Sequence, residues 1–417
     1  MAQFKTLPQG LAYIETLHPQ TMALGLERVS QVADRLQLRH FNCPVVTIGG
    51  TNGKGSCAAF LTAILQAQGY RVGTYTSPHL IQFQERIALQ SQPVSEASLL
   101  EAFQVVEHAR DNIPLTYFEF TTLAALQIFR QQPLDALILE VGLGGRLDAV
   151  NIVEPDLSIV TSIALDHMAW LGDTREAIAY EKAGIFRPDK PAICGDPDPP
   201  ATLLQYAQQI QAQLFVANRD FTWHKNATSW NWQTHTEQWD NLPLPQLHIM
   251  NAATALMALT CLKPRLNIEY AALQQGLREA YLPGRFQCFT QPRSIILDVA
   301  HNPAATILLA ERLQSTPITG KTLAVVGMLA DKDIAGTLKP LLSVVDAWFL
   351  STLPESRGAK AIALATQLSS LGVNHYDQYE SVLTAFDQAV ANCGPTDRII
   401  VFGSFHTVGP ILSRLRE

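Results

Sequence analysis

The stretch Pro44–Ser56, PVVTIGGTNGKGS, decides the fold of this 417-residue chain. Its first part, Pro44–Ile48, is an apolar and mostly β-branched run with the length of a buried strand. A helical pattern, Ser56–Gln68, follows after a glycine-rich turn. A strand, a tight turn and a helix in this order are typical of one unit of a parallel α/β sheet.

The turn itself, Gly49–Ser56, is suited to holding phosphate groups. Glycines let several backbone N–H groups point toward one anion, and the following helix adds the positive end of its dipole. Lys54 can reach the outer phosphates, and Ser56 can bind phosphate or a metal ion. The spacing differs from the common P-loop, because Ile48 stands where that motif has its first glycine and Gly55 separates the lysine from the serine. We predict a phosphate site, with a plain strand–helix turn as the alternative.

The alternation of strands and helices continues in two blocks. In the first block we expect strands at Arg71–Tyr75, Asp135–Glu140 and Leu157–Thr161, and helices at Ser95–Arg110, Phe118–Arg130, Thr174–Ala183 and Asn251–Leu262. After a Pro-Gly pair within Tyr281–Arg285, we expect strands at Ser294–Val299, Thr322–Val326, Asp346–Ser351 and Arg398–Phe402, and helices at Pro303–Gln314 and Ala359–Ser369. The prediction is therefore α/β: a P-loop-type parallel-sheet domain over 1–284 and a smaller Rossmann-like domain over 285–417.

One segment of the first block, 220–247, differs from the rest. It holds four of the six tryptophans, Trp223, Trp230, Trp232 and Trp239, in partial alternation, which is typical of antiparallel strands. We expect a small antiparallel hairpin inserted among the α/β units. The tryptophans are interpreted as packing residues rather than as an aromatic platform for a ligand.

The composition excludes several classes of protein. Apolar residues make up 47% of the chain and charged residues 16%, so the chain can bury a large core and is not disordered. No apolar run reaches the roughly 18 residues of a membrane span, and the sequence opens without a signal-peptide pattern. The net charge of −7 argues against general binding of nucleic acid, and six scattered cysteines without a CxxC pair argue against a disulfide framework. We expect a soluble cytoplasmic enzyme.

Three polar residues come at the carboxyl ends of predicted strands. Ser77 follows the strand at 71–75, Glu140 ends its own strand, and His167 follows the strand at 157–161. These strand ends line the same edge of the sheet as the phosphate turn, so the three side chains could hold a divalent cation there. Each also has an ordinary explanation: turn chemistry for the serine, a helix cap for the glutamate and a structural role for the histidine.

Further polar candidates are Lys182, Arg285 and the Asp298–Pro303 turn. Lys182 ends a predicted helix, where a cation also simply complements the helix dipole. Arg285 lies in the linker between the two domains and could reach a phosphate. Asp298 and His301 crowd at a strand end and suggest nucleotide contacts, although helix capping explains part of this turn equally well.

An ordered series of short motifs resembles bacterial folylpolyglutamate synthase/dihydrofolate synthase, a branch of the Mur-ligase-like ATP-dependent amide ligases. The first matching stretches are LGLERV (24–29), GTNGKGS (50–56), TSPHL (76–80), ERI (85–87), LEVGLGGRLDAVN (139–151), LDHMAWLG (165–172) and EKAGIF (181–186). The last third adds PGR (283–285), DVAHNP (298–303), GMLADKD (327–333) and GSFHTVG (403–409). Each stretch is weak alone, but the series in the family's order is specific and spans nearly the whole chain.

The resemblance implies ATP and two magnesium ions as cofactors, and it admits a monovalent cation such as K+. The ATP-binding residues that it implies are Thr51, Asn52, Gly53, Lys54, Gly55, Ser56, Asn251, Arg285, Asp298 and His301. The metal ligands that it implies are Ser77, Glu140, His167 and Lys182, the last as a carbamate. The residues expected to carry catalysis are Lys54, His167, Lys182 and Arg285.

The resemblance also implies the substrates and the reaction. The pterin-site residues that it implies are Ala23, Leu24, Gly25, Leu26, Thr116, Tyr117, Phe118, Glu119, Leu147, Asp148 and Ala149. In that site Phe118 would stack on the pterin ring, and Asp148 would hydrogen-bond its edge. The family activates the carboxylate of dihydropteroate or tetrahydrofolate as an acyl phosphate, and L-glutamate then displaces phosphate to give dihydrofolate or folylpolyglutamates. A monomer with small-molecule partners, and with neither nucleic acid nor membrane, is expected.

Several alternatives stay open on sequence alone. A cell-wall Mur ligase that acts on a UDP-linked acid shares the ATP machinery, although the separate N-terminal domain expected for a UDP-sugar is missing. A catalytically inactive folate- or nucleotide-binding protein is disfavoured, because every matched catalytic residue type is present. An unrelated P-loop ATPase or kinase is disfavoured by the loop spacing and the second α/β domain. The motifs do not decide between a bifunctional enzyme and one with the polyglutamate activity alone.

Overall fold

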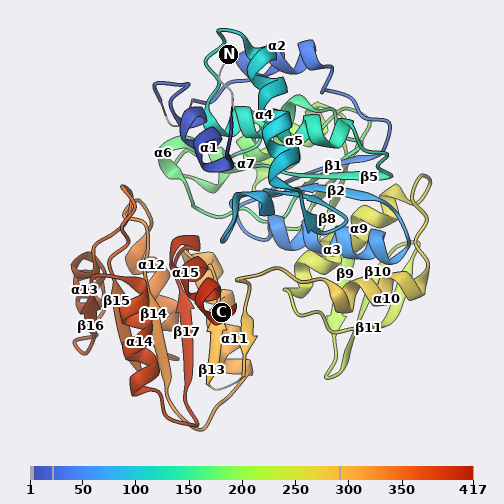
Figure 1. Ribbon diagram of the computed structural model, residues 1–417. Coiled ribbons are helices and arrows are strands. Elements are labelled where there is room, and N and C mark those ends of the chain that lie inside the picture. The colour runs from blue at the N-terminus through green and yellow to red at the C-terminus, as the bar shows by residue number, and fades with distance from the viewer. Residues whose placement is uncertain (1–3, 21–22, 291–292, 417) are drawn as a thin grey trace. The chain divides into compact units, whose positions relative to one another are not determined.

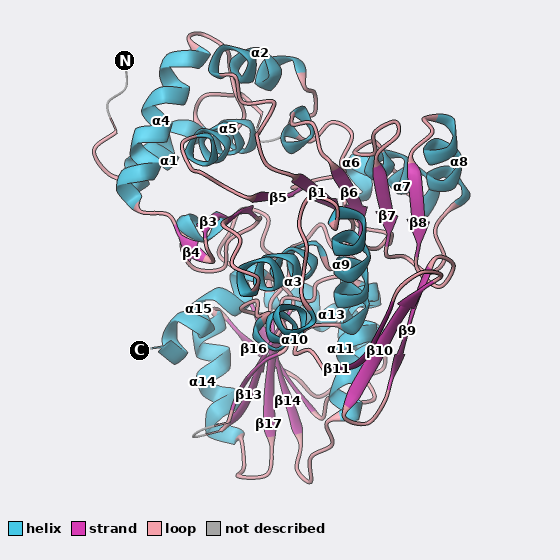
Figure 2. Cartoon of the chain, turned by 90° about the vertical axis from the view of Figure 1, so that its right-hand side faces the viewer, coloured by secondary structure: helices cyan, strands magenta, loops and turns pink. Residues whose placement is uncertain are grey.

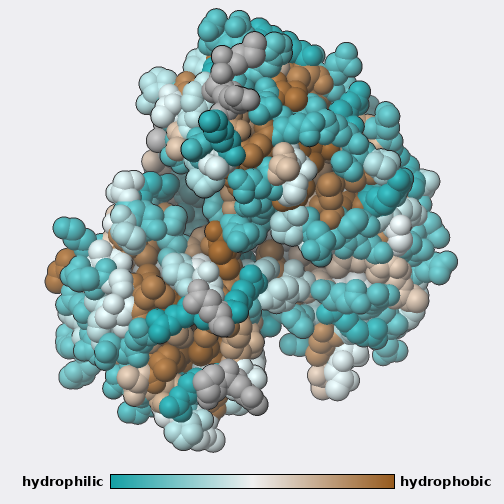
Figure 3. All heavy atoms as spheres, viewed as in Figure 1, coloured by the Kyte–Doolittle hydropathy of each residue, from teal (hydrophilic) through white to brown (hydrophobic). Residues whose placement is uncertain are grey.

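The computed structural model describes residues 4–20, 23–290 and 293–416 (Figure 1). The chain divides into two units, one formed by Met1–His79 with Gln84–Tyr281 and the other by Leu80–Phe83 with Leu282–Glu417. None of the helices in the described ranges combines the length and the apolar character that crossing a bilayer requires. On the face shown in Figure 3, hydrophilic residues predominate and hydrophobic residues form separate patches.

The first unit is built on an eight-stranded sheet. Its strands are β1 (Val45–Gly49), β2 (Val72–Tyr75), β3 (Ile87–Leu89), β4 (Gln92–Pro93), β5 (Ala136–Glu140), β6 (Leu157–Val160), β7 (Pro191–Cys194) and β8 (Gln213–Val216). Their order is β4–β3–β2–β5–β1–β6–β7–β8, and all are parallel except β3 and β4 at one edge. Every residue of β1, β5 and β6 is buried, which explains why these central strands read as continuous apolar runs.

Helices cover both faces of this sheet. They are α1 (Leu7–Glu15), α2 (Glu27–Leu36), α3 (Lys54–Ala67), α4 (Glu96–Arg110), α5 (Tyr117–Arg130), α6 (Met168–Leu171), α7 (Arg175–Ala183), α8 (Ala201–Gln209), α9 (Ile249–Leu262) and α10 (Tyr270–Glu279), with 3₁₀ turns η1 (Phe83–Arg86) and η2 (Ala149–Ile152). In Figures 1 and 2, α4 and α5 lie on one side of the strands, and α3 and α9 lie on the other. α3 packs against both α9 and α10, which explains why its sequence is apolar on most sides.

The tryptophan-rich segment forms a small antiparallel sheet of three strands, β9 (Phe221–Lys225), β10 (Ser229–Thr234) and β11 (Gln238–Pro243) (Figure 2). The prediction of a hairpin was therefore wrong in its strand count, because the polar sequence of β11 lacks a strand pattern. Trp230 and Trp232 are fully buried, and their indole N–H groups donate to the carbonyl oxygens of Pro243 at 2.9 Å and Ala253 at 3.1 Å. For these two residues the packing interpretation is confirmed.

The second unit is a six-stranded sheet with helices on both faces. Its strands are β12 (Gln287–Phe289), β13 (Ser294–Leu297), β14 (Thr322–Val326), β15 (Ala347–Ser351), β16 (Asp377–Tyr379) and β17 (Arg398–Phe402), in the order β12–β13–β17–β14–β15–β16. Its helices are α11 (Pro303–Ser315), α12 (Ile334–Leu338), η3 (Lys339–Leu341), α13 (Ala361–Ser370), α14 (Val382–Asn392) and α15 (Phe405–Arg416). All strands are parallel except the edge strand β12.

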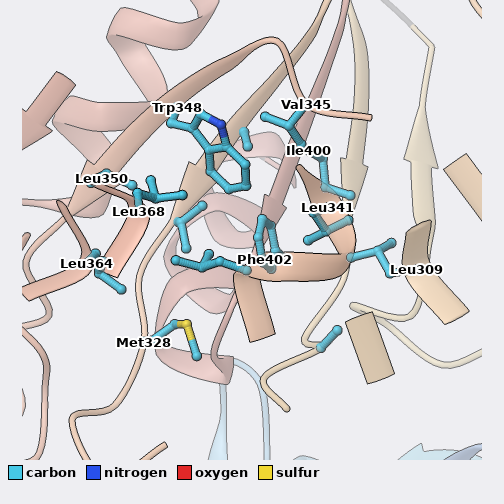
Figure 4. Close-up of a cluster of buried hydrophobic side chains, with 14 of the residues drawn as sticks. Leu309, Met328, Leu341, Val345, Trp348, Leu350, Leu364, Leu368, Ile400 and Phe402 are labelled. Atoms are coloured by element: carbon cyan, nitrogen blue, oxygen red, sulfur yellow. The ribbon is translucent and has the colours of Figure 1, made fainter. Parts of the chain in front are cut away.

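Alternate residues of these strands build two separate cores. Ile400 and Phe402 of β17 join a core with α11 and α13, in which Trp348 is also buried (Figure 4). Ile399 and Val401 of the same strand face the other side, where α14 and α15 close a second core. This doubly wound arrangement confirms the predicted fold class, and the predicted strands and helices are present with ends displaced by one or two residues.

Candidate active site

The loop between β1 and α3 leaves helix N–H groups available to a ligand. α3 begins at Lys54, and no described side chain caps its first turn. Gly53 at the N-cap has φ of +89°, a conformation that residues with a Cβ rarely adopt, and a Cβ there would also collide with the side chain of Asn251. Uncapped N–H groups at the positive end of a helix dipole favour an anion, as the sequence predicted for this turn.

The segment that follows β6 holds the same loop. The Thr51 N–H donates to the carbonyl oxygen of Ser162 at 2.8 Å, and the Asn52 N–H donates to the Ser162 hydroxyl at 3.0 Å. The Thr51 hydroxyl donates to the carbonyl oxygen of Ala164 and accepts from its N–H, both at 3.1 Å. The backbone N–H groups of Thr51 and Asn52 are thus used within the protein. The N–H groups available to a ligand are those of the uncapped first turn of α3.

Two lysines lie close to this loop. The ammonium group of Lys54 donates to the carbonyl oxygens of Gly50 at 3.0 Å and Thr51 at 3.3 Å. Lys182, near the end of α7, is buried, and its burial together with the positive charge of Lys54 lowers its pKa to about 7. Lys182 lies in the last turn of α7, as the sequence predicted, whereas its burial was not predicted. With a pKa of about 7, a substantial fraction of this amine is uncharged at neutral pH, and the uncharged form is nucleophilic.

Asp148 and Asp166 are the acidic groups that act on Lys182. Asp148 accepts from the N–H groups of Leu143 at 2.8 Å and Val150 at 3.0 Å, so it shapes the loop that follows β5. Burial raises the pKa of Asp148 to about 6. Asp166 was not predicted as a site residue, although it directly precedes His167 in the LDHMAWLG motif.

The predicted metal ligands come from three strand ends. The Ser77 N–H donates to Glu140 Oε2 at 3.1 Å, so these two residues are adjacent as expected. His167 is the N-cap of α6, with φ of +52° and a partly exposed imidazole. No group of three or more His, Cys, Asp and Glu side chains in the described ranges is arranged to hold a metal ion.

The first two pterin segments meet through an arginine that the sequence did not single out. Arg28 Nη2 donates to Glu119 Oε1 at 3.0 Å and to the carbonyl oxygen of Ala23 at 2.9 Å. Glu119 also accepts from the Thr116 N–H at 2.7 Å, and Thr116 Oγ1 accepts in return from the Glu119 N–H at 3.3 Å, which is a capping box for α5. Thr116 and Glu119 therefore hold the segment in shape, whether or not they touch a ligand.

The Phe118 ring of the second pterin segment lies against Gly142, in the loop that follows β5. A Cβ at Gly142 would lie 2.5 Å from this ring, so the position after Val141 accommodates glycine alone without a shift of Phe118. Tyr75 is another neighbour of the ring, with ring centroids 6.1 Å apart. Phe118 is half-buried, which leaves part of the ring accessible to a ligand. Leu147 is also half-buried, and Ala149 is buried.

Two of the candidates of the second unit, Arg285 and His301, lie near the ring of Phe405, which the sequence analysis did not single out. The Arg285 guanidinium lies 5.1 Å from the centre of the Phe405 ring, and the His301 ring lies 6.4 Å from it. Asp298 accepts from the N–H groups of Phe286 and Ala300, both at 2.8 Å, and desolvation raises its pKa while Arg285 opposes that rise. Asn302, in the same turn, is the N-cap of α11, and its side chain accepts a hydrogen bond from the Ala305 N–H. Helix capping, the alternative explanation for this turn, is therefore present.

Comparison with known proteins finds two matching family models and a similar protein of full length. The model described as the Mur ligase middle domain matches residues 48–255, and the model described as the Mur ligase glutamate ligase domain matches residues 284–405. The dihydrofolate synthase/folylpolyglutamate synthase of Escherichia coli (strain K12) is 47% identical over 408 residues, which cover 97% of this chain and 94% of that protein.

Two solved structures agree over the full length. The structure of E. coli FolC in complex with DHPP and ADP has a TM-score of 0.96 at 45% identity, covering 100% of this chain and 99% of that one. A bifunctional folylpolyglutamate synthase/dihydrofolate synthase with Mn, AMPPNP and L-glutamate bound has a TM-score of 0.94 at 47% identity, covering 100% of both chains.

Proposed function

This chain belongs to the Mur ligase family, and from that membership we propose the reaction of its dihydrofolate synthase/folylpolyglutamate synthase branch. It is an ATP-dependent ligase that joins L-glutamate to dihydropteroate, forming dihydrofolate, and to tetrahydrofolate, forming folylpolyglutamates. The observation that carries this proposal is the match to the E. coli enzyme over nearly all of both chains. The bound ADP and L-glutamate of the two structural relatives support the same reaction class.

The reaction overcomes the low reactivity of a carboxylate toward an amine. The acceptor carboxylate attacks the γ-phosphorus of ATP, ADP leaves, and an acyl phosphate forms. The amine of L-glutamate then adds to the acyl carbon, and the tetrahedral intermediate expels phosphate as the amine loses its proton. Both steps gather negative charge on phosphoryl oxygens, so fixed positive groups are the main contribution of the protein. The uncapped first turn of α3 and the ammonium group of Lys54 supply such groups in the first unit.

We propose that nucleotide contacts come from both units of the chain. Those of the first unit are Thr51, Asn52, Gly53, Lys54, Gly55, Ser56 and Asn251. Those of the second unit are Arg285, Asp298 and His301, and Arg285 and His301 both lie near the Phe405 ring. We also propose that residues 1–284 form a domain that binds ATP and folate, and that residues 285–417 form a ligase domain.

A divalent cation belongs to this reaction, as the Mn-containing relative indicates. The residues present fit magnesium, because Ser77 and Glu140 are adjacent and offer the oxygen donors that this ion prefers. When bound, the ion would neutralise charge on the phosphoryl oxygens. We propose Ser77, Glu140 and His167 as its ligands. A monovalent cation such as K+ is part of the same proposal.

We propose Lys182 as a ligand of a second magnesium ion, in the form of a carbamate. The uncharged amine adds to carbon dioxide and loses a proton, which yields a carbamate anion with two oxygen donors. The buried position of Lys182 and its pKa of about 7 support this proposal, because a substantial fraction of the amine is unprotonated near neutral pH. Together with Lys54, His167 and Arg285, it completes the proposed catalytic set.

The proposed pterin site combines three segments of the first unit. These are 23–26, 116–119 and 147–149, which include Phe118 as the stacking residue and Asp148 as the polar contact. The capping box at the start of α5 and the Arg28 link support it, because they hold the first two segments together. The monomeric state and the cytoplasmic location stay predictions that rest on the sequence.

The deciding experiment is phosphate release from Mg-ATP with L-glutamate, measured with 7,8-dihydropteroate and separately with tetrahydrofolate. We expect turnover with both acceptors. Turnover with tetrahydrofolate alone would reduce the proposal to a folylpolyglutamate synthase and remove the support for the pterin contacts at Phe118 and Asp148. Absence of turnover with both acceptors would refute the proposed reaction.

A further inference from the structure

The segment 161–164, directly after β6, bonds on both sides of Ile163 to the loop between β1 and α3, which we call the phosphate loop. Before Ile163, the carbonyl oxygen of Ser162 accepts from the Thr51 N–H at 2.8 Å. After it, the Ala164 backbone exchanges two hydrogen bonds of 3.1 Å with the Thr51 hydroxyl. The phosphate loop therefore depends on this segment for its position.

Ile163 itself is held by an ion pair that comes from two other elements. Its N–H donates to Asp196 Oδ2 at 2.8 Å, and its carbonyl oxygen accepts from Arg175 Nε at 3.0 Å. The two side chains also pair with each other, since Arg175 Nη2 lies 3.2 Å from Asp196 Oδ2. Both backbone groups of a residue that is only 3% exposed are thus bound by one carboxylate–guanidinium pair. We call Arg175 and Asp196 the Ile163 clamp.

The carboxylate of the Ile163 clamp has a defined position. β7 pairs with β6 in parallel, so the loop that carries Asp196 leaves the same edge of the sheet as the segment 161–164 (Figure 2). Asp196 Oδ1 accepts from the Asp198 N–H at 3.0 Å, and Arg175 Nη2 donates to the Asp198 carbonyl oxygen at 2.8 Å. The preceding Gly195 packs closely on α9, because a Cβ there would lie 2.5 Å from Thr254 Oγ1.

The bonds to the main chain distinguish the Ile163 clamp from an ordinary surface ion pair. An exposed pair joins two side chains and contributes little. Here the Asp196 side chain is only 9% exposed, and the N–H that it accepts from has no other source of compensation without movement. Since an unpaired buried N–H is costly, loss of the carboxylate should displace Ile163. Ser162 and Ala164 would move with it, and so would their bonds to Thr51.

Resting on the proposed function, we propose that Arg175 and Asp196 are positioning residues for the phosphates of ATP. They act without touching the nucleotide: they hold Ile163, the segment 161–164 holds the phosphate loop, and the loop presents the first turn of α3. Stabilisation of phosphoryl charge depends on donors that are already in place, and a displacement of about 1 Å can lower the rate about 10²-fold. Both residues lie outside the motifs that indicated the reaction, so sequence analysis singled out neither.

The test measures Asp196→Ala in the phosphate-release assay with tetrahydrofolate and L-glutamate. We expect the KM for ATP to rise about tenfold, which corresponds to about 1.4 kcal/mol and lies within the cost of an unpaired buried N–H. The dissociation constant of AMPPNP should rise by the same factor, whereas the KM for tetrahydrofolate should change by less than about threefold. A loss of stability alone would lower the thermal midpoint and leave the KM for ATP of the folded enzyme unchanged.

Asp156→Ala is the matched control, because Asp156 makes the same kinds of bond at the opposite end of β1 and β6. It accepts from the Val45 N–H at 2.9 Å and from Arg265 Nη1 at 2.7 Å. Its replacement therefore also removes a bond to the main chain and an ion pair, but away from the phosphate loop. We expect a lower thermal midpoint for Asp156→Ala and a KM for ATP at the wild-type value.

Two further variants keep the test independent of the folding of Asp196→Ala. Asp196→Asn keeps an oxygen that can accept from the Ile163 N–H, and its KM for ATP should stay within about threefold of wild type. Because the two residues act on the same backbone unit, Arg175→Ala/Asp196→Ala should raise the KM for ATP by no more than about twofold beyond the larger single effect.

Three results would overturn the assignment of the Ile163 clamp. They are an unchanged KM for ATP in Asp196→Ala, an equal rise in Asp156→Ala, and single effects that multiply in the double variant. Each presupposes that wild type releases phosphate with tetrahydrofolate. If wild type does not, the proposed function is refuted first and this inference fails with it.

Discussion

Replacing Gly53 by alanine tests whether the phosphate loop and Asn251 form one unit. Two costs are expected from the structure. The first is the backbone cost of alanine at φ +89°, about 1–2 kcal/mol. The second is the collision between the new Cβ and the Asn251 side chain, which is 6% exposed and has little room to move. Overpacking of this kind typically costs about 1–3 kcal/mol.

Gly69 provides a matched control for the first cost. Its φ is +95°, and nothing lies within 4 Å of the position that a Cβ would occupy. Gly69→Ala should therefore lower the free energy of unfolding by the same backbone cost, about 1–2 kcal/mol, and leave nucleotide binding unchanged. Any larger effect of Gly53→Ala then reports the collision with Asn251 rather than the backbone.

The assay is thermal unfolding of the full chain with and without AMPPNP. At a concentration of about 100 times the dissociation constant, a ligand of the folded state adds about 2.7 kcal/mol of stability. We expect wild type and Gly69→Ala to gain this stabilisation and Gly53→Ala to lose most of it. The double variant Gly53→Ala/Asn251→Ala should be more stable than the sum of the single effects predicts, because it removes the collision. Equal unfolding and equal nucleotide stabilisation for Gly53→Ala and Gly69→Ala would refute the reasoning.

Three further predictions follow from the site. Lys54→Ala should lower kcat by about 10²–10³ while the thermal midpoint stays close to that of wild type, and near-normal phosphate release by a folded variant would remove this lysine from the mechanism. Glu119→Ala should lower the free energy of unfolding in urea by about 2–4 kcal/mol, because the capping box of α5 and the partner of Arg28 are both lost, and a loss below about 1 kcal/mol would contradict this role. The pKa of Lys182 is about 7 in the folded chain and 10.5 in the unfolded chain, so the unfolded chain binds more protons between these values and stability should rise with pH across that window. In CO₂-free buffer the urea midpoint of Lys182→Met should lack this rise, and parallel pH profiles for wild type and variant would count against the burial of a free amine.

The strands that the sequence predicted are buried along most of their length, although the largely buried β7 was missed. β1 and β17 are buried at every residue and read as continuous apolar runs, so their pattern survives in the sequence. The exposed β4 and the half-exposed β16 have two and three residues, which is too short for any period to show. β11 is polar along most of its length, so its pairing with β10 depends on the hairpin rather than on hydrophobic pattern.

The site residues at the ends of parallel strands could be predicted from the sequence. The contacts that depend on packing between residues far apart in the chain could not. Ser77 and Glu140 were expected to meet because parallel strands place their carboxyl ends together. The link from Arg28 to Glu119 joins residues 91 positions apart, and no local pattern announces it. Burial of Lys182 depends on the elements packed around the end of α7, so its altered pKa is a property of the tertiary structure.

The segment from Thr161 to Leu171 touches both ligand loops, and this has a thermodynamic consequence. It bonds to Thr51 at one end and lies against Gly144 at the other. Any coupling that it transmits between the two loops must be reciprocal: the factor by which a pterin changes nucleotide affinity equals the factor by which nucleotide changes pterin affinity. The total binding free energy must therefore be the same whether the protein is titrated first with nucleotide and then with pterin, or in the reverse order.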